Sequence, residues 1–341
     1  MRKIIALGLL IVLTFGLVAC GGKASSEVKK SDEPITLKFA TQHPLDHIAH
    51  SSAEAIKERV ERETEGRVLL EIYPASQLGD WSLVYEEVIR GTIEIAHISV
   101  PEKYDARVTV GFLPYLAKSY DQLREIFAYD SLLSTQMEEI QAENNVKFLG
   151  YYCEGFSGIG TVDELVDPAS SNISKDALVR VSSNDVLKFP AERLGFRTST
   201  IPYNDTFAAM QTGVVDGWVG GPPNLNYLTF RDVINYYYHY NLTHESTQYI
   251  INNDIFENMS KADQEVIEDA FREQCEASFD LAEADDEKFM EMMEESGIEV
   301  IKFSDEELEA MASDIRENVW PKFEEKFTKE LLDGLRESLV E

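Results

Sequence analysis

One arginine lies where an apolar strand is expected. Residues 178–181 read Leu-Val-Arg-Val, so Arg180 is the only charge in a run typical of a strand that is buried on both faces. A buried cation is unfavourable unless an anion pairs with it. The partner is either a carboxylate of the protein core or the carboxylate of a bound ligand, which the planar guanidinium fits well. The residues alone leave both interpretations open.

A tryptophan follows in a stretch rich in glycine and proline. Trp218 lies between Gly217 and Gly220, and Pro222 comes shortly after. Glycine lets a loop adopt conformations that other residues avoid, so this segment can present the indole ring to a ligand. The alternative is an ordinary core tryptophan.

Four potential metal ligands lie within eight residues, namely His43, Asp46, His47 and His50. On a helix, His47 and His50 are three positions apart and face the same side. This is a partial metal site, but no distant cysteine or histidine clearly completes it. The alternative, a polar loop and helix start near the mouth of the pocket, is favoured, and we expect no metal.

Two weaker motifs lie in the glycine-rich run between Gly150 and Gly160. Gly155-Phe156-Ser157-Gly158-Ile159 resembles a nucleophile elbow, but its fifth position is not glycine. The glycines also lack the spacing of a dinucleotide-binding loop. The run instead indicates a crossing between two lobes, and we expect neither catalysis nor a cofactor.

The composition limits the partners of this chain of 341 residues. It is 44% hydrophobic and 27% charged, which is typical of a globular protein of one large or two smaller domains. Its net charge is −31, with 62 acidic and 31 basic residues. Such a surface excludes nucleic acid and electrostatic binding to anionic lipid. A site for an anionic ligand must therefore be local and buried.

The N-terminus predicts export and a lipid anchor. Arg2 and Lys3 precede an uncharged apolar run over residues 4–19, as in a secretory signal. Leu17-Val18-Ala19-Cys20 resembles the bacterial lipobox, in which the cysteine carries the lipid. We expect a signal peptide over 1–19, a flexible tether over 20–34 and an extracytoplasmic protein, in the periplasm or on the outer face of the cell membrane, anchored through Cys20. An uncleaved signal anchor is the alternative.

The remaining cysteines, Cys153 and Cys275, do not have metal-ligand spacing. Their separation in sequence does not show whether they approach each other, so a disulfide stays open. Two buried free thiols are the simpler interpretation.

The hydrophobic pattern alternates between strands and helices. Strands are expected at 35–41, 68–73, 93–99, 146–153, 178–181, 214–219, 235–242, 247–252 and 298–303. Helices are expected at 46–65, 80–90, 119–144, 185–194, 204–211 and 261–296, followed by C-terminal helices after 304. The β-α-β-α-β order predicts parallel strands in an α/β fold, with ligands bound at the strand C-termini between two lobes.

Several motifs then occur in a familiar order. They are Gly66-Arg67-Val68, the run Ile72-Tyr73-Pro74-Ala75-Ser76-Gln77-Leu78-Gly79-Asp80, Arg90-Gly91-Thr92-Ile93-Glu94, Val179-Arg180-Val181, and Phe207-Ala208-Ala209-Met210-Gln211-Thr212-Gly213-Val214-Val215-Asp216-Gly217. Together they resemble the solute-binding proteins of TRAP (tripartite ATP-independent periplasmic) transporters, over nearly all of the chain after residue 35.

The resemblance implies a two-lobed fold of the periplasmic-binding-protein type. Each lobe is a mainly parallel sheet flanked by helices, and crossing strands and a long helix join the lobes. We expect lobe I to comprise 35–154 and 247–283, and lobe II 155–246 and 284–341. The resemblance further implies a receptor that captures an organic acid and delivers it to the TRAP membrane permease, with no catalysis.

The resemblance also assigns the site residues. The arginine of the family's Arg-Val motif, here Arg180, clamps the substrate carboxylate. The other positions that match the family's pocket, together with His43 beside them, form the expected ligand-binding set: Gln42, His43, Trp81, Ser99, Ser157, Tyr203, Trp218 and Gly220.

Two departures from the family pattern narrow the ligand. Many members carry a second arginine where this chain has Ser157, and Gln-Glu-Asn where it has Trp218, Val219 and Gly220. The pocket has therefore lost polar groups and gained Trp81 and Trp218. This predicts a monocarboxylate or a sulfonate with an apolar body, including aromatic ones stacked on tryptophan.

Two other functions stay open from the sequence. A lipoprotein of the same fold can present its ligand to a sensor kinase instead of a permease. An exported metal-dependent enzyme using residues 43–50 is the second, and the missing ligands and acid/base pair argue against it.

Overall fold

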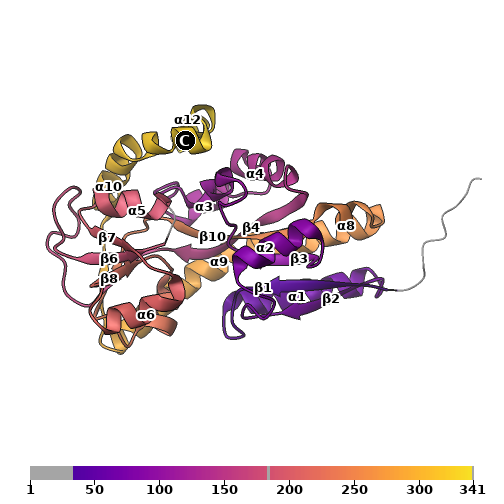
Figure 1. The fold of residues 1–341 in the computed structure, drawn as a ribbon, viewed down its shortest axis with the longest axis horizontal. Coiled ribbons are helices and arrows are strands. Elements are labelled where there is room, and N and C mark those ends of the chain that lie inside the picture. The colour runs from indigo at the N-terminus through magenta and orange to yellow at the C-terminus, as the bar shows by residue number, and fades with distance from the viewer. Residues whose placement is uncertain (1–33, 183–184, 340–341) are drawn as a thin grey trace, which may run out of the picture. The chain divides into compact units, whose positions relative to one another are not determined.

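The computed structural model describes residues 34–182 and 185–339. The predicted signal peptide over 1–19, Cys20 and all but the last residue of the predicted tether lie outside the described residues. Within the described part of the chain, the strands form one sheet of five strands and one of six (Figure 1). No helix in that part is long and apolar enough to cross a membrane.

The first sheet combines parallel and antiparallel strands. In spatial order its strands are β2 (Val68–Tyr73), β1 (Ile35–Thr41), β3 (Ile95–Ile98), β10 (His244–Asn252) and β4 (Val146–Phe156). β1 pairs in parallel with β2 and β3, as the βα units require. β10 runs antiparallel to both of its neighbours because it returns from the second sheet.

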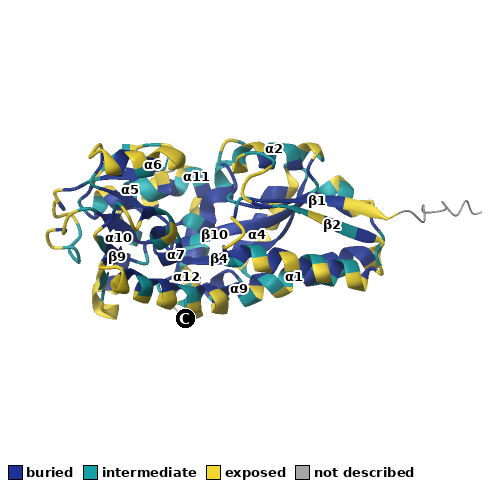
Figure 2. Ribbon diagram, turned by 90° about the horizontal axis from the view of Figure 1, so that it is seen from below, coloured by how far each residue is buried: buried dark blue, intermediate teal, exposed yellow. Residues whose placement is uncertain are grey.

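Helices cover both faces of the first sheet. They are α1 (Ile48–Glu63), α2 (Trp81–Arg90), η1 (Ala106–Phe112), α3 (Tyr120–Ile126), α4 (Leu132–Ala142) and α8 (Asn253–Glu257). Side chains alternate along β1, so Leu37 and Phe39 pack in the cluster that contains α1, while Ala40 packs in the cluster that contains α2. Figure 2 shows the resulting buried interior between strands and helices.

The second sheet is built in the same way. Its strands are β11 (Glu299–Lys302), β9 (Tyr236–His239), β5 (Ile159–Thr161), β8 (Gly217–Val219), β6 (Leu178–Val181) and β7 (Arg197–Thr200). Its helical segments are α5 (Asp185–Arg193), α6 (Tyr203–Gln211), α7 (Pro223–Leu225) and the π-helical turn η2 (Asn226–Phe230). β6 pairs in parallel with β7 and β8, while β5 is antiparallel to β8 and β9.

One helix contributes to the packing of both sheets. α9 (Lys261–Glu295) has 35 residues, which corresponds to a length of about 52 Å. Phe271 packs in the core of the first sheet, and Met293 packs in the core of the second. Asp286 lies between them and accepts hydrogen bonds from the Tyr120 hydroxyl (2.5 Å) and the Phe156 amide (3.3 Å). The predicted long connecting helix is therefore present.

The C-terminal helices contact elements of the first sheet's layer. They are α10 (Asp305–Asn318), η3 (Trp320–Phe323), α11 (Glu324–Phe327) and α12 (Lys329–Ser338). Trp320 Nε1 donates to the Pro114 carbonyl (2.9 Å), and the Arg316 guanidinium donates to the Tyr115 carbonyl. We predicted that residues 284–341 belong to lobe II, but these hydrogen bonds join them to residues 114–115, which were assigned to lobe I. The lobe boundaries stay a prediction.

Most predicted elements agree with the structure, and the exceptions have local causes. The helix expected over 119–144 is two helices, because Ser131 caps a new one by accepting a hydrogen bond from the Ser134 amide (3.1 Å). The short strands β5 and β7 were not expected. The sheets are also mixed, because the crossing strands return antiparallel to the predicted parallel βα units. Cys153 and Cys275 are both free and buried.

The chain leaves the first sheet after β4 through a crossing that requires glycine. A Cβ atom placed on Gly158 would lie 2.5 Å from Cζ of Tyr237, whose ring is fully buried. The Gly158 amide donates to the Gly221 carbonyl (3.2 Å), which links the crossing to the segment after β8. A side chain at Gly158 would therefore displace the crossing segment that joins the two sheets.

We predict that Gly158→Ala lowers the free energy of unfolding by about 2 kcal/mol, because the added methyl group overpacks a buried ring. Urea denaturation followed by circular dichroism measures this loss. In a Tyr237→Leu background the clash is removed, so the same substitution should have a much smaller effect. Equal losses in both backgrounds would contradict this explanation.

Candidate ligand-binding site

Arg180 lies near the C-terminal end of β6 and is nearly buried, with 6% of its surface exposed. Its Nε donates to the carbonyl of Ile201 (2.8 Å), and its Cζ lies 5.9 Å from the ring centroid of Tyr203. Among the described residues, no carboxylate lies within 4.0 Å of it. Of the two partners considered for Arg180, a core carboxylate in direct contact is therefore not found in this part of the chain.

Burial affects the electrostatics of this cation. It lowers the pKa of Arg180 to about 10, while nearby Tyr203 and Glu245 oppose the shift. The guanidinium thus stays charged at neutral pH in a poorly hydrated place. This is the environment in which a carboxylate ligand gains most from a charge-assisted hydrogen bond.

Gln42 and Ser99 are brought together by two parallel strands. They directly follow β1 and β3, whose C-terminal ends lie side by side. The Gln42 amide donates to Ser99 Oγ (3.2 Å), and the Ser99 backbone amide donates to Gln42 Oε1 (3.0 Å). Two of the predicted ligand residues thus meet at the C-terminal ends of parallel strands, where α/β folds bind ligands, and their role in binding stays a prediction.

The predicted aromatic residues differ in exposure. Tyr203 begins α6 and is 41% exposed, and Trp81 begins α2 and is 42% exposed. Trp218 is only 2% exposed, because Nε1 donates to Asn226 Oδ1 (2.9 Å) and the ring packs at 4.3 Å from that of Phe230. The loop role expected for Trp218 thus differs from the structure, in which it lies in strand β8 as a core residue.

Three further predicted residues line this region with their polar groups engaged. Ser157 is buried and its Oγ donates to the Thr243 carbonyl (3.1 Å). Gly220 has φ +133°, a value suited to glycine, and a Cβ atom placed on it would lie 3.3 Å from Cζ3 of Trp218. His43 is buried, with Nδ1 3.0 Å from Thr41 Oγ1.

The structure adds a polar cluster that sequence reasoning missed. His43 Nε2 lies 2.7 Å from Glu154 Oε1, and Thr247 Oγ1 donates to the same oxygen (2.6 Å). Thr247 Oγ1 also lies 2.8 Å from His97 Nε2. Glu154 is a charge within the apolar strand β4, so the criterion that identified Arg180 would also have found it.

The cluster keeps Glu154 ionised. Burial by itself would raise the pKa of Glu154, but His43, which pairs with it, and the neighbouring His47 and His97 hold it well below its usual range. Burial lowers the pKa of His47 to about 4 and that of His97 well below its usual value. These imidazoles are therefore neutral at pH 7.

The same cluster is a candidate metal site. His43, His97 and Glu154 offer ligand atoms within 4.8 Å of one another. The fold thus brings His97 and Glu154, which are distant in sequence, close to His43. However, the hydrogen bonds to His43 and Thr247 already account for the orientation of the Glu154 carboxylate, and we retain the prediction of no metal.

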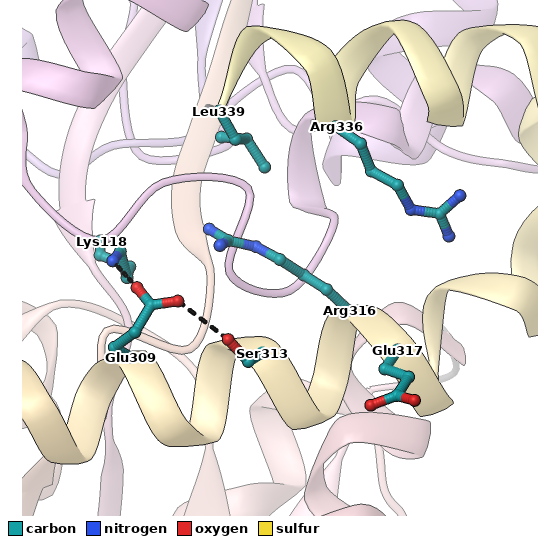
Figure 3. Close-up of a pocket in the computed structure, with 7 residues that line it drawn as sticks. All are labelled: Lys118, Glu309, Ser313, Arg316, Glu317, Arg336 and Leu339. Atoms are coloured by element: carbon teal, nitrogen blue, oxygen red, sulfur yellow. Dashed lines mark hydrogen bonds and ion pairs between the residues drawn. The ribbon is translucent and has the colours of Figure 1, made fainter. Parts of the chain in front are cut away.

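Two surface cavities contain none of the predicted ligand residues. Figure 3 shows the first, of about 600 Å³, lined by Lys118, Glu309, Ser313, Arg316, Glu317, Arg336 and Leu339. Its cations have partners, because Lys118 pairs with Glu309, Arg316 with the Tyr115 carbonyl and Arg336 with Asp333. The second, of about 620 Å³, lies beside α3 and α9. The candidate binding site therefore lies at Arg180 near the end of β6 and at Gln42 and Ser99 after β1 and β3.

The two sheets, their crossing strands and the charged strand ends define a two-lobed solute-binding protein. A family model described as "Bacterial extracellular solute-binding protein, family 7" matches residues 39–326. The chain belongs to this family, which confirms the predicted relationship to TRAP solute-binding proteins and supports an extracytoplasmic location.

Curated relatives agree over most of the chain. It is 22% identical over 272 residues to the sialic acid-binding periplasmic protein SiaP of Vibrio cholerae, covering 78% of this chain and 82% of that protein. It is 23% identical over 317 residues to the ectoine-binding periplasmic protein TeaA of Halomonas elongata, covering 84% and 85%.

Solved structures show the same fold. A TRAP periplasmic solute-binding protein from Ochrobactrum anthropi has a TM-score of 0.79 at 20% identity, covering 89% of this chain and 94% of that chain. Another from Desulfovibrio salexigens, with bound orotic acid, has a TM-score of 0.79 at 18% identity, covering 89% and 98%. The predicted α/β fold class is confirmed.

The buried histidines predict acid sensitivity. Burial lowers the pKa of His244 to about 3, from 6.5 in an unfolded chain, and Glu154 opposes this only partly. Since the unfolded state then takes up a proton first, stability should fall as the pH drops from about 6.5 towards 3. His47 acts in the same direction.

We therefore predict that His244→Phe removes about 3 kcal/mol of the stability lost between pH 7 and pH 4. The new ring should be accepted between Phe127 and Phe279, which already contact the imidazole. Urea denaturation at both pH values measures the difference. A pH dependence equal to that of the unsubstituted protein would show that His244 does not contribute.

Proposed function

We propose that this protein is a lipid-anchored receptor that captures an organic acid outside the cytoplasm and delivers it to the permease of a TRAP-type transporter. The single observation that carries this proposal is the buried, charged Arg180 at a strand end, without a carboxylate partner among the described residues. A receptor that closes on an anion needs such a cation, because a buried carboxylate without a partner is strongly unfavourable.

The relatives support the chemical class. Relatives bind sialic acid and ectoine, and structures of similar TRAP solute-binding proteins hold orotic acid, D-glucuronate and L-gulonate. Each of these carries a carboxyl group that a guanidinium can bind. The ligand of this chain is then a carboxylate or a sulfonate, held by Arg180 beside Tyr203, with Gln42 and Ser99 at the opposite strand ends. The protein acts without catalysis.

We predict that Arg180→Ala lowers affinity for the best organic acid at least tenfold, since it removes the charge-assisted hydrogen bonds to the carboxylate. Arg180→Lys should retain part of the affinity, because the charge remains but the planar pair of donors is lost. The ligand is first found by a thermal-shift screen of organic acids, and affinities are then measured by calorimetry. Unchanged affinity in folded Arg180→Ala protein would refute this anchor.

The proposed lipid anchor is tested separately. Cys20→Ser should remove the acceptor of the lipid and shift the exported protein from the membrane fraction to the soluble fraction. Fractionation and mass spectrometry of the mature N-terminus measure both effects. Membrane association that persists without Cys20 would contradict a lipoprotein and favour an uncleaved signal anchor.

A further inference from the structure

A second ionisable residue, Glu245, lies beside the proposed anion clamp and was not singled out in the sequence. It is the second residue of β10, in the strand that returns to the first sheet. The side chain is half-buried. Within residues 34–182 and 185–339, its carboxyl group has no hydrogen bond or ion pair. A carboxyl in this state is available to a ligand.

The strand geometry directs Glu245 to the polar cluster. Side chains alternate along a strand, so Glu245 and Thr247 lie on the same face of β10. The pairing of β4 with β10 shifts between His244 and Ser246, but the extra residue lies in β4, so the alternation along β10 is kept. Since Thr247 bonds to Glu154, Glu245 lies on the same side as that carboxylate.

Electrostatics connect Glu245 to the clamp. Burial and, to a smaller extent, the charge of Glu154 raise the pKa of Glu245 to about 8, although Arg180 opposes the shift. Arg180 and Tyr203 are both influenced by Glu245 in turn. Nevertheless, the charged atoms of Arg180 and Glu245 are more than 4.0 Å apart. Arg180 and Glu245 thus lie close enough to influence each other's pKa, and both influence the pKa of Tyr203, but they do not form an ion pair.

The charged groups around Glu245 select between ligands. They are the cation Arg180 and the carboxylate Glu154, with the carboxyl group of Glu245 itself. A ligand with only negative charge satisfies Arg180 but is opposed by the ionised Glu154 and leaves Glu245 protonated, and a dicarboxylate is opposed more strongly. A ligand that also carries a cation satisfies both sides, because its carboxylate meets Arg180 and its cation meets Glu245.

We propose that the ligand is a zwitterion, with its carboxylate on Arg180 and an ammonium or quaternary ammonium group on Glu245. The inference rests on the proposed function, since it assumes that Arg180 holds a carboxylate. It goes further by naming Glu245 as a specificity-determining residue. The exposed ring of Tyr203 lies where it can contact the cation or the apolar body of the ligand.

Matched ligand pairs test the proposal. Each zwitterion is compared with an acid of the same shape in which carbon replaces the charged nitrogen. Suitable pairs are glycine betaine with tert-butylacetate, phenylalanine with its analogue that has a methyl group in place of the ammonium, and ω-amino acids with the corresponding alkanoates. In calorimetry with protein treated with EDTA, we predict that the tightest ligand is a zwitterion that binds at least tenfold better than its isostere.

Glu245→Gln provides the second measurement, since it keeps the shape but removes the charge. The preference for the zwitterion over its isostere should fall at least tenfold. Glu257→Gln is the matched control, because Glu257 is exposed on α8 and makes the same change of charge. The preference of the Glu257→Gln variant for the zwitterion over its isostere should equal that of the unsubstituted protein.

Proton release gives a readout that a structural role would not change. A bound cation favours the ionised form of Glu245, so binding near pH 7 should release a proton, and Glu245→Gln should abolish this. The groups facing Glu245 are Glu154 on β4, Arg180 on β6 and Tyr203 on α6. Calorimetry in two buffers of different ionisation enthalpy measures the protons released.

The outcomes separate the two proposals. If plain acids bind best, depend on Arg180 and ignore Glu245→Gln, the proposed function stands and the zwitterion is refuted. If a plain acid binds tightly only with a divalent metal that EDTA removes, the cation is not part of the ligand and the inference is likewise refuted. If no carboxylate binds at all, the proposed function itself fails.

Discussion

The burial of the Arg180 guanidinium is the constraint on which the rest of the binding site depends. The strand β6 and the ring of Tyr203 shield it from water, yet it stays charged at neutral pH. Because a buried charge is stable only with an opposite charge, the protein needs an anion at the C-terminal end of β6. The amide of Gln42 and the hydroxyl of Ser99 lie at equivalent strand ends of the other sheet, where the rest of a ligand can be bound.

Glu245, which influences this cation, and Glu154, which influences Glu245, are held in different protonation states. His43 and Thr247 contact Glu154, which stays ionised, whereas burial favours the protonated form of Glu245. A ligand therefore meets one fixed positive charge, one fixed negative charge and one group whose charge responds to it. Selectivity in such a site arises as much from repulsion of unsuitable ligands as from attraction of the right one.

These residues belong to different sheets, and the crossing strands bring them together. β4 and β10 carry Glu154 and Glu245, and both strands lead directly to the second sheet, which carries Arg180. The helix α9 packs in both cores, and Asp286 in its C-terminal third accepts hydrogen bonds from Tyr120 and from Phe156 at the start of the crossing. The connection between the sheets therefore contributes to the candidate site. Gly158 is required in this connection because a side chain there would clash with the Tyr237 ring.

The sequence alone determined the fold class and most strand and helix positions, and it singled out Arg180 as a candidate ligand anchor. These follow from local hydrophobic periodicity and from the cost of a charge in an apolar strand. Only the tertiary structure decided which side chains meet. Glu154 and His97 are far from His43 in sequence, and Trp218 became a core residue through its bond to Asn226. Glu245 gained its role in the same way, since long-range strand pairing has no signature in a local pattern.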